Sequence, residues 1–242
     1  MTQSSYKNFT IHQFETLEST NKTAFELTDL RKISDFEIIL AKSQTAGKGR
    51  KQRVWSSLNG NLYFSLVLKP KISANKIPQI SFVAAVSLKL ALEKLVKNVA
   101  VKWPNDLLIE EKKCAGILLE SKFNQNNCEF VILGIGVNID SNPSNTIFPA
   151  TNLKNFSIEI SALKMLEKFL DEFEKIYQNY LDFDFAGIRK LWLKNAYKLG
   201  EKITIKIDEK EIDGIFENID EDANLLIRKD DEIIKISVGD VS

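Results

Sequence analysis

The order of strand and helix patterns along the chain constrains its fold more than any other feature of the sequence. Seven apolar or alternating segments typical of strands occur before residue 140, and only two helical patterns interrupt them. Further helical patterns follow, without the regular strand–helix–strand alternation of a parallel sheet. This order predicts an α+β fold, in which a mixed β-sheet is covered by helices. The predicted strands are Phe9–Phe14, Phe36–Ala41, Asn61–Leu68, Val99–Lys102, Asp106–Ile109, Cys114–Ser121 and Glu129–Ile139.

Two long helical patterns supply the predicted cover of the sheet. In Gln79–Val96 apolar residues recur at positions 80, 84, 88, 91 and 95, which places them along one face of a buried helix. Phe156–Tyr180 is the longest candidate, and Gly187–Ala196 predicts a shorter helix. A further helix is expected to end near Leu30, because the polar residues 19–21 can cap its start.

The pattern changes at Leu199–Gly200, where short alternating strands joined by polar turns begin. We therefore expect two domains, a larger one over residues 1–196 and a small β-barrel over residues 197–242. The strands of this barrel are predicted at Ile203–Ile207, Glu211–Asn218, Asn224–Arg228 and Glu232–Val238.

The charge balance excludes some classes of function. With 33 basic and 33 acidic residues the chain has no net charge, which argues against a general nucleic-acid binder. The positive charge is local, because nine Lys or Arg and no acidic residue lie between Glu37 and Glu93, whereas residues 200–242 hold 13 acidic and 6 basic residues. Such a segment suits a compact anion better than a long phosphate backbone.

The sequence predicts a reduced, cytoplasmic protein without a membrane span. It has two cysteines without the spacing of a disulfide pair, no leader segment and no apolar run of 18 residues. One histidine, His12, and two separated cysteines argue against a zinc site and against a Ser-His-Asp or Cys-His nucleophile.

The segment from Thr45 to Trp55 places four basic residues on a loop with two glycines, Gly47 and Gly49. Exposed backbone N–H groups in such a loop form a concavity for an anion, and arginine adds forked donors suited to phosphate or carboxylate. A solvated basic turn is the alternative at this stage, since the segment does not match the P-loop pattern.

Three further motifs follow the basic loop. In Lys102–Asp106, Pro104 interrupts the strand, and the resulting bend can direct a lysine and a carboxylate to one site; an Asn-Asp turn is the alternative. Gly116, after Lys113, predicts a close approach to that strand, although a simple hairpin also fits. In Gly134–Asn138 two alternating glycines leave one strand face bare beside the loop, which makes a slot for a flat ligand.

These motifs, in this order, resemble those of the biotin-protein ligases. The segments that carry the resemblance are Ser19–Asn21, Gln44–Trp55, Lys102–Asp106, Lys113–Leu118 and Gly134–Asn138, and with the β tail it extends over nearly the whole chain. The resemblance implies a class II synthetase-like catalytic domain followed by an SH3-like barrel. It also implies that biotin and MgATP form biotinyl-5'-AMP, from which a lysine of the apo biotin carboxyl carrier protein of acetyl-CoA carboxylase takes the biotinyl group.

The resemblance also implies roles for individual residues, with Arg50, Arg53 and Lys113 as the catalytic cations. Trp55 would pack on adenine, and no tightly bound prosthetic group is implied. The metal ligands stay unknown; apart from the resemblance, Asp106 is the only carboxylate near the cluster, and it could hold a metal ion or orient a lysine. The implied biotin contacts are Ser19, Thr20, Asn21, Gln44, Gly47, Lys48, Gly49, Arg50, Lys113, Gly116, Gly134 and Gly136, and the implied adenylate contacts are Arg50, Arg53, Trp55, Lys102, Asn105, Asp106 and Asn138.

Two residues depart from the family's Gly-Arg-Gly-Arg-x-Gly-Arg pattern. Lys48 keeps the charge of an arginine but loses its forked geometry, and Gln52 replaces a glycine, so that a left-handed backbone there would be strained. Some family members carry an N-terminal DNA-binding domain; only about eight residues precede the first predicted strand here, so we expect a monofunctional ligase that binds no DNA. A homodimer is possible, but no feature of the sequence identifies its interface.

Two other functions stay open at this point. Lipoate-protein ligases and octanoyl transferases share the catalytic fold, although Lys102–Asp106 and the β tail favour biotin. A non-enzymatic binding module on the same fold is the second alternative, because the two departures in the loop are compatible with lost catalysis.

Overall fold

The large sheet of the protein is mixed, as the sequence predicts. In the computed structural model, which describes residues 1–125, 127–144, 146 and 148–241, eight strands form this sheet in the order β1-β2-β3-β4-β8-β7-β6-β5. β2 and β3 are parallel, and every other neighbouring pair is antiparallel. The strands are β1 (Thr2–Tyr6), β2 (Phe9–Leu17), β3 (Glu37–Gln44), β4 (Leu62–Leu68), β5 (Val99–Lys102), β6 (Asp106–Ile109), β7 (Lys112–Asn124) and β8 (Asn127–Val137).

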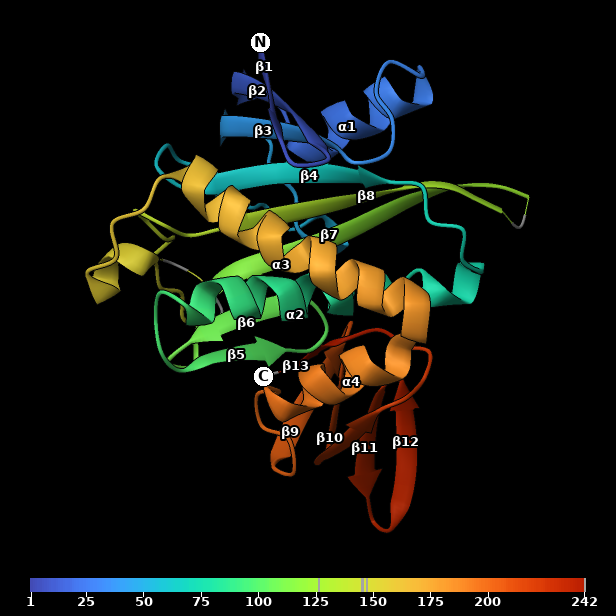
Figure 1. Ribbon diagram of the computed structural model, residues 1–242. Coiled ribbons are helices and arrows are strands. Elements are labelled where there is room, and N and C mark those ends of the chain that lie inside the picture. The colour runs from blue at the N-terminus through green and yellow to red at the C-terminus, as the bar shows by residue number, and fades with distance from the viewer. Residues whose placement is uncertain (126, 145, 147, 242) are drawn as a thin grey trace.

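Helices α2 (Gln79–Glu93) and α3 (Ala162–Phe183) lie side by side over one face of this sheet (Figure 1). Their apolar residues meet those of the central strands; the rings of Phe64 on β4 and Phe169 on α3 are 5.3 Å apart. Helix α1 (Thr20–Asp29) packs through Ala24 on other sheet residues, including Ile39 and Val67. Because strand side chains alternate between faces, Ile38 and Ile39 join separate apolar clusters.

The predicted start of the longest helix at Phe156 is wrong. Residues 153–156 form a short 3-10 turn, and Ser157 then adopts a left-handed conformation with φ of 58°. Helix α3 begins only after Ser161, whose Oγ accepts a hydrogen bond from the backbone N–H of Lys164 at 3.2 Å. The local cap, rather than the apolar periodicity, sets the start of this helix.

The C-terminal residues form a separate antiparallel sheet of five strands in the order β12-β11-β10-β9-β13. Helix α4 (Phe185–Lys194) leads into it, and Trp192 of this helix packs near Phe216 with ring centroids 6.3 Å apart. Buried residues of both sheets and of α4 belong to one apolar cluster. The strands are β9 (Lys202–Ile207), β10 (Lys210–Ile219), β11 (Leu225–Lys229), β12 (Glu232–Ile236) and β13 (Asp240–Val241).

Two strands were not predicted. β1 has an exposed polar sequence, Thr-Gln-Ser-Ser-Tyr, and pairs with β2 through its backbone, so its side chains carry no pattern of burial. β13 has only two residues. Within the described ranges, no helix has the length and apolar character that crossing a membrane requires.

Candidate active site

The predicted site residues gather on the face of the large sheet that α2 and α3 leave open. Gly134 and Gly136 alternate on β8 with Leu133 and Ile135, which belong to the same apolar cluster as the residues of α2 and α3. Helix α1 covers one end of the open face. The basic loop, residues 45–55, covers the part above Gly116 and Gly136 through Trp55.

A polar corner, made of Thr20, Asn21, Gln44, Ser57 and Ser65, lies at the start of α1. The backbone N–H and the Oγ1 of Thr20 lie 2.7 and 3.1 Å from Gln44 Oε1, and Gln44 Nε2 donates to Ser57 Oγ at 2.8 Å. Ser19 is the N-cap of α1 and accepts from the backbone N–H of Lys22. The polar residues at 19–21 and Gln44, predicted from distant motifs, therefore lie together in the structure.

Three members of this region were missed by the sequence analysis. Ser65 Oγ lies 2.8 Å from Thr20 Oγ1 and 2.5 Å from Asn21 Oδ1, and Glu120 accepts a hydrogen bond of 2.7 Å from Asn21 Nδ2. Ser57 binds Gln44. A signal for Ser65 was present, because a serine in the middle of a strand of leucine, phenylalanine, tyrosine and valine has to find a hydrogen-bond partner when buried.

The glycine strip is not bare, which corrects the prediction of an open slot. Gly116 and Gly136 are cross-strand partners, and the indole of Trp55 lies against both of them. A Cβ on Gly136 would meet Trp55 Cε2 and Nε1 at 2.5 Å, and one on Gly116 would meet its Cζ3 at 2.8 Å. Gly134 makes room in the same way for Asn21, whose Oδ1 would lie 2.0 Å from an added Cβ. The glycines seat the protein's own side chains.

The fold of the basic loop depends on Gly47 and on two left-handed residues. Gly47 accepts from the backbone N–H of Trp55 at 2.9 Å, and a Cβ there would meet Ser57 Oγ and Trp55 O at 2.6 Å. Gly49 donates to Arg53 O at 2.8 Å. Lys51 and Gln52 have φ of 52° and 59°. Gln52 therefore adopts the left-handed backbone that would be strained there, at a cost of about 1–2 kcal/mol for a residue with a Cβ.

The arginines of the loop contact the C-terminal sheet through Asp240 of β13. Arg53 Nη2 lies 2.6 Å from Asp240 Oδ2, and Arg50 Nη1 lies 3.5 Å from Oδ1 and donates to Gly239 O at 3.2 Å. Burial lowers the pKa of Arg50, and the nearby Asp240 carboxylate opposes this shift. Lys48, in contrast, is exposed. Asp240 could not be predicted, since it lies in an acidic tail far from the motifs.

Lys113 and Asp106 form an ion pair below Trp55, with 2.7 Å between Nζ and Oδ1. The ammonium of Lys113 also lies 5.3 Å from the centroid of the Trp55 ring. The predicted bend brings Lys102 and Asp106 together as cross-strand partners. Lys102 is buried, its Nζ lies 3.2 Å from the centroid of the Phe148 ring, and burial lowers its pKa to about 8.

The two asparagines of the implied adenylate contacts, Asn105 and Asn138, bind the backbone. Asn105 Nδ2 donates to Ile117 O at 2.5 Å, and its Oδ1 lies 3.4 Å from Arg50 Nη1. Asn138 is buried and donates to Thr151 O at 3.0 Å. Asn138 therefore holds the segment that returns to Lys113, whose backbone N–H donates to Pro149 O at 2.7 Å.

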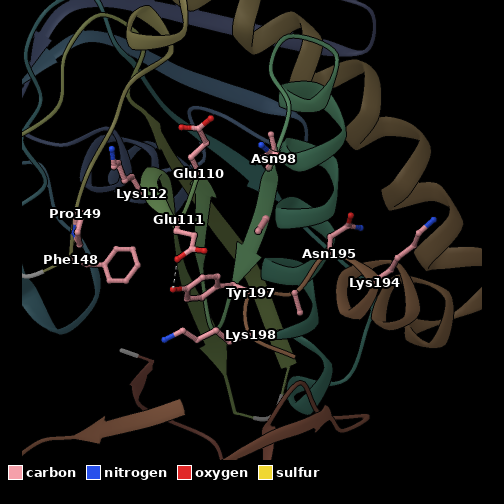
Figure 2. A pocket seen from close by; sticks show the side chains of 13 residues that line it. Asn98, Glu110, Glu111, Lys112, Phe148, Pro149, Lys194, Asn195, Tyr197 and Lys198 are labelled. Carbon is pink, nitrogen blue, oxygen red and sulfur yellow. Dashed lines mark hydrogen bonds between the residues drawn. The ribbon is translucent and has the colours of Figure 1, made fainter. Parts of the chain in front are cut away.

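An open pocket of the surface lies beside the predicted site rather than in it. This pocket of about 990 Å³ is lined by the β5 edge, the β6–β7 turn, residues 148–149 and residues 194–198 (Figure 2). Tyr197 and Glu111 point toward each other across it, with 3.4 Å between their oxygens. None of its lining residues belongs to the predicted set. The polar and cationic side chains converge on the glycine strip instead, where the indole of Trp55 lies.

Among the residues that the structure describes, no three His, Cys, Asp or Glu side chains lie close enough together to hold a metal ion. Asp106 is instead paired with Lys113. A single carboxylate is compatible with magnesium that is held mainly by phosphates and water, so the arrangement suits an ion that enters with a nucleotide.

Comparison with known proteins shows which family the chain resembles. Residues 13–138 match the model of the Biotin/lipoate A/B protein ligase family, and residues 198–242 match the Biotin protein ligase C terminal domain. The chain is 38% identical over 220 residues to the biotin--[acetyl-CoA-carboxylase] ligase of Paracoccus denitrificans, covering 87% of this chain and 91% of that protein. It is 34% identical over 236 residues to the bifunctional ligase/repressor BirA of Bacillus subtilis, covering 94% and 72%.

The fold is also similar to that of a solved ligase. The biotin protein ligase from Aquifex aeolicus, in a complex with biotin and ATP, matches with a TM-score of 0.82 and 28% identity over 96% of this chain and 97% of that one. Its likeness extends across both sheets. Together, the two family models and these relatives establish that the chain belongs to the biotin protein ligase family.

Proposed function

We propose that this protein attaches biotin to a lysine of a biotin carboxyl carrier protein, the carrier of acetyl-CoA carboxylase, in two steps that use ATP. In the first step, a biotin carboxylate oxygen attacks the α-phosphorus of ATP and pyrophosphate leaves. In the second, the lysine amine attacks the acyl carbon of biotinyl-5'-AMP and AMP leaves. Both segments that match ligase family models, residues 13–138 and 198–242, and the likeness to a biotin--[acetyl-CoA-carboxylase] ligase support this assignment.

The observation that carries the proposal is the meeting of a polar corner and a group of cations on one sheet face. The corner offers the amide and hydroxyl groups of Thr20, Asn21 and Gln44 to a polar ring. Beyond the glycine strip, Lys113, Arg50 and Arg53 offer positive charge where two anions have to meet. Attack of a carboxylate on a phosphate needs position and positive charge more than a proton-transfer residue.

The same proposal assigns the remaining predicted residues. Ser19, Gly47, Lys48, Gly49, Gly116, Gly134 and Gly136 would line the biotin site, and Trp55, Lys102, Asn105, Asp106 and Asn138 would serve the nucleotide. When the ligand binds, Trp55 would have to leave the glycine strip. Lys113 and Arg53 would then exchange the carboxylates of Asp106 and Asp240 for phosphate oxygens. Magnesium would enter with ATP. The basic loop would then exclude water from the reactive mixed anhydride.

The lipoate alternative is less well supported. The C-terminal sheet matches a domain of biotin protein ligases, and the polar corner would bury hydrogen-bonding groups against an apolar ring. We propose a catalytic domain over residues 1–196 and a C-terminal domain over residues 197–242, in a cytoplasmic protein. A gel shift and sedimentation test the predicted lack of DNA binding and the possible homodimer.

The proposal is tested by carrier labelling. The protein is incubated with ATP, an apo carrier domain and equal amounts of biotin and lipoate, and the modified carrier lysine is identified by mass spectrometry. We expect biotinylation alone. Labelling by lipoate would support the alternative ligase, and an unlabelled carrier with folded protein would reject the assignment.

A further inference from the structure

Ser65 lies at the centre of the polar corner and has no part in the motifs that carry the family likeness. It is fully buried in β4, and its cross-strand partner on β8 is Gly134, the glycine on which Asn21 sits. Its Oγ lies within hydrogen-bond distance of both Thr20 Oγ1 and Asn21 Oδ1. Ser65 is thus the group that joins the two adjacent residues at the start of α1.

The hydroxyl groups of this corner have fewer protons than the oxygen–oxygen contacts that need one. Three contacts link hydroxyl oxygens to oxygen partners, namely Ser65 with Thr20, Ser65 with Asn21 Oδ1, and Thr20 with Gln44 Oε1. Asn21 Oδ1 and Gln44 Oε1 are acceptors only, so the protons must come from the two hydroxyl groups, which carry one each. Three oxygen–oxygen contacts therefore share two protons.

The orientation of the Asn21 amide is fixed from the other side. Its Nδ2 donates to the carboxylate of Glu120, which can only accept when ionised. Asn21 therefore presents its Oδ1 to Ser65. Gln44 Oε1 already accepts from the backbone N–H of Thr20 at 2.7 Å. The corner is left with acceptor lone pairs that lack a donor, and a ligand that brings N–H groups supplies what is missing.

We propose that Ser65 is a positioning residue that sets the specificity of the site for a ring with N–H donors. This inference rests on the proposed function and deepens it: the ureido ring of biotin has two N–H groups, whereas the ring of lipoate and the chain of octanoate have none. Ser65 holds Thr20 and Asn21 so that their oxygens accept from the ligand. An apolar head in the same place leaves these acceptors buried without a donor, which is how a hydrogen-bonding site rejects such analogues.

The test compares Ser65→Ala with a matched control, Ser87→Ala. Ser87 is equally buried, and its Oγ donates one hydrogen bond of 2.7 Å to Val83 O within α2, away from the site. Titration calorimetry measures the Kd values of biotin, octanoate and ATP, and the Tm is recorded. We expect Ser65→Ala to weaken biotin binding by about 10-fold, the effect of one lost hydrogen bond, with octanoate and ATP binding within about twofold of wild type.

A second variant keeps the test decisive if Ser65→Ala does not fold. Glu120 is exposed, and Glu120→Gln lets the Asn21 amide turn over, since glutamine can donate as well as accept. We expect weaker biotin binding with unchanged Tm and octanoate affinity. The inference is overturned if folded Ser65→Ala binds biotin as tightly as wild type, or, when that variant is unfolded, if Glu120→Gln does. An equal loss of affinity for octanoate also overturns it. A wild-type protein that binds no biotin instead rejects the proposed function.

Discussion

Gly136→Ala should push Trp55 off the glycine strip. The new Cβ would lie 2.5 Å from two atoms of the indole, whereas nonbonded carbon atoms pack at about 3.5–4.0 Å. The ring therefore has to move by about 1 Å or more. If it shifts only slightly, the crowding should cost about 1–3 kcal/mol of folding free energy; if it leaves, the loop loses the contact of the indole with the sheet. In either case the new methyl group occupies the strip where the ligand would lie, so the rate of biotin-dependent pyrophosphate release should fall.

The control for this variant is Gly187→Ala. Gly187 lies within α4, and an added Cβ there meets nothing within 4 Å. Alanine in a helix interior is favoured over glycine by roughly 0.5–1 kcal/mol, so this variant should be slightly more stable than wild type and fully active. The two substitutions add the same methyl group, and only one of them meets Trp55.

Tryptophan fluorescence reports the movement directly. The other two tryptophans, Trp103 and Trp192, are only 3% and 1% exposed, so a red shift on Gly136→Ala should come from Trp55. The shift should disappear when Gly136→Ala is made in a Trp55→Phe background. An emission spectrum and a pyrophosphate-release rate equal to wild type would refute the packing of Trp55 on this strip.

Four further predictions concern the charged groups of the site. Lys113→Met should slow biotin-dependent pyrophosphate release by roughly 100- to 1000-fold, as expected when a charge-stabilising donor is lost; a change below tenfold in a quench-flow assay would contradict the assignment. Asp240→Asn frees Arg53 from a carboxylate, so calorimetry should show severalfold tighter ATP binding at low salt, with little difference at 1 M salt; weaker binding would contradict it. Burial lowers the pKa of Lys102 to about 8, so its charge is lost as the pH rises through 8. The KM for ATP should therefore rise between pH 7 and 9. The Lys102→Arg variant stays charged over this range and should abolish that rise. In the unfolded chain Lys102 has the ordinary lysine pKa of 10.5, so the unfolded state binds more protons than the folded state from about pH 8 to 10.5. Lys102 should therefore make the free energy of unfolding rise with pH over this window. Urea titrations of Lys102→Met should lack that contribution.

The apolar patterns were enough to predict the central strands and α2, since burial on one or both faces leaves a period in the sequence. The start of α3 was misplaced because a serine cap and a left-handed residue decide it locally. β1 pairs through its backbone while its side chains stay exposed, so its pattern carried no signal.

The candidate site was predictable where a motif combines unusual residue types, as at Lys113 and Gly116. Contacts between distant segments were not, and Asp240 meets Arg53 across 187 positions of sequence. The sequence also did not predict that Trp55 covers the glycine strip, because glycines in a strand indicate only that some group lies close to them. Their partner is set by how the loop folds back.

The central claim is that this protein makes biotinyl-5'-AMP and holds it for transfer. The most direct measurement uses ATP labelled at the α-phosphate, with biotin, pyrophosphatase and no carrier, followed by rapid separation of protein from free nucleotide. We predict about one labelled adenylate per folded chain, dependent on biotin, that is released as AMP when apo carrier is added and biotinylated. Label that is absent, or that appears without biotin, would contradict the claim.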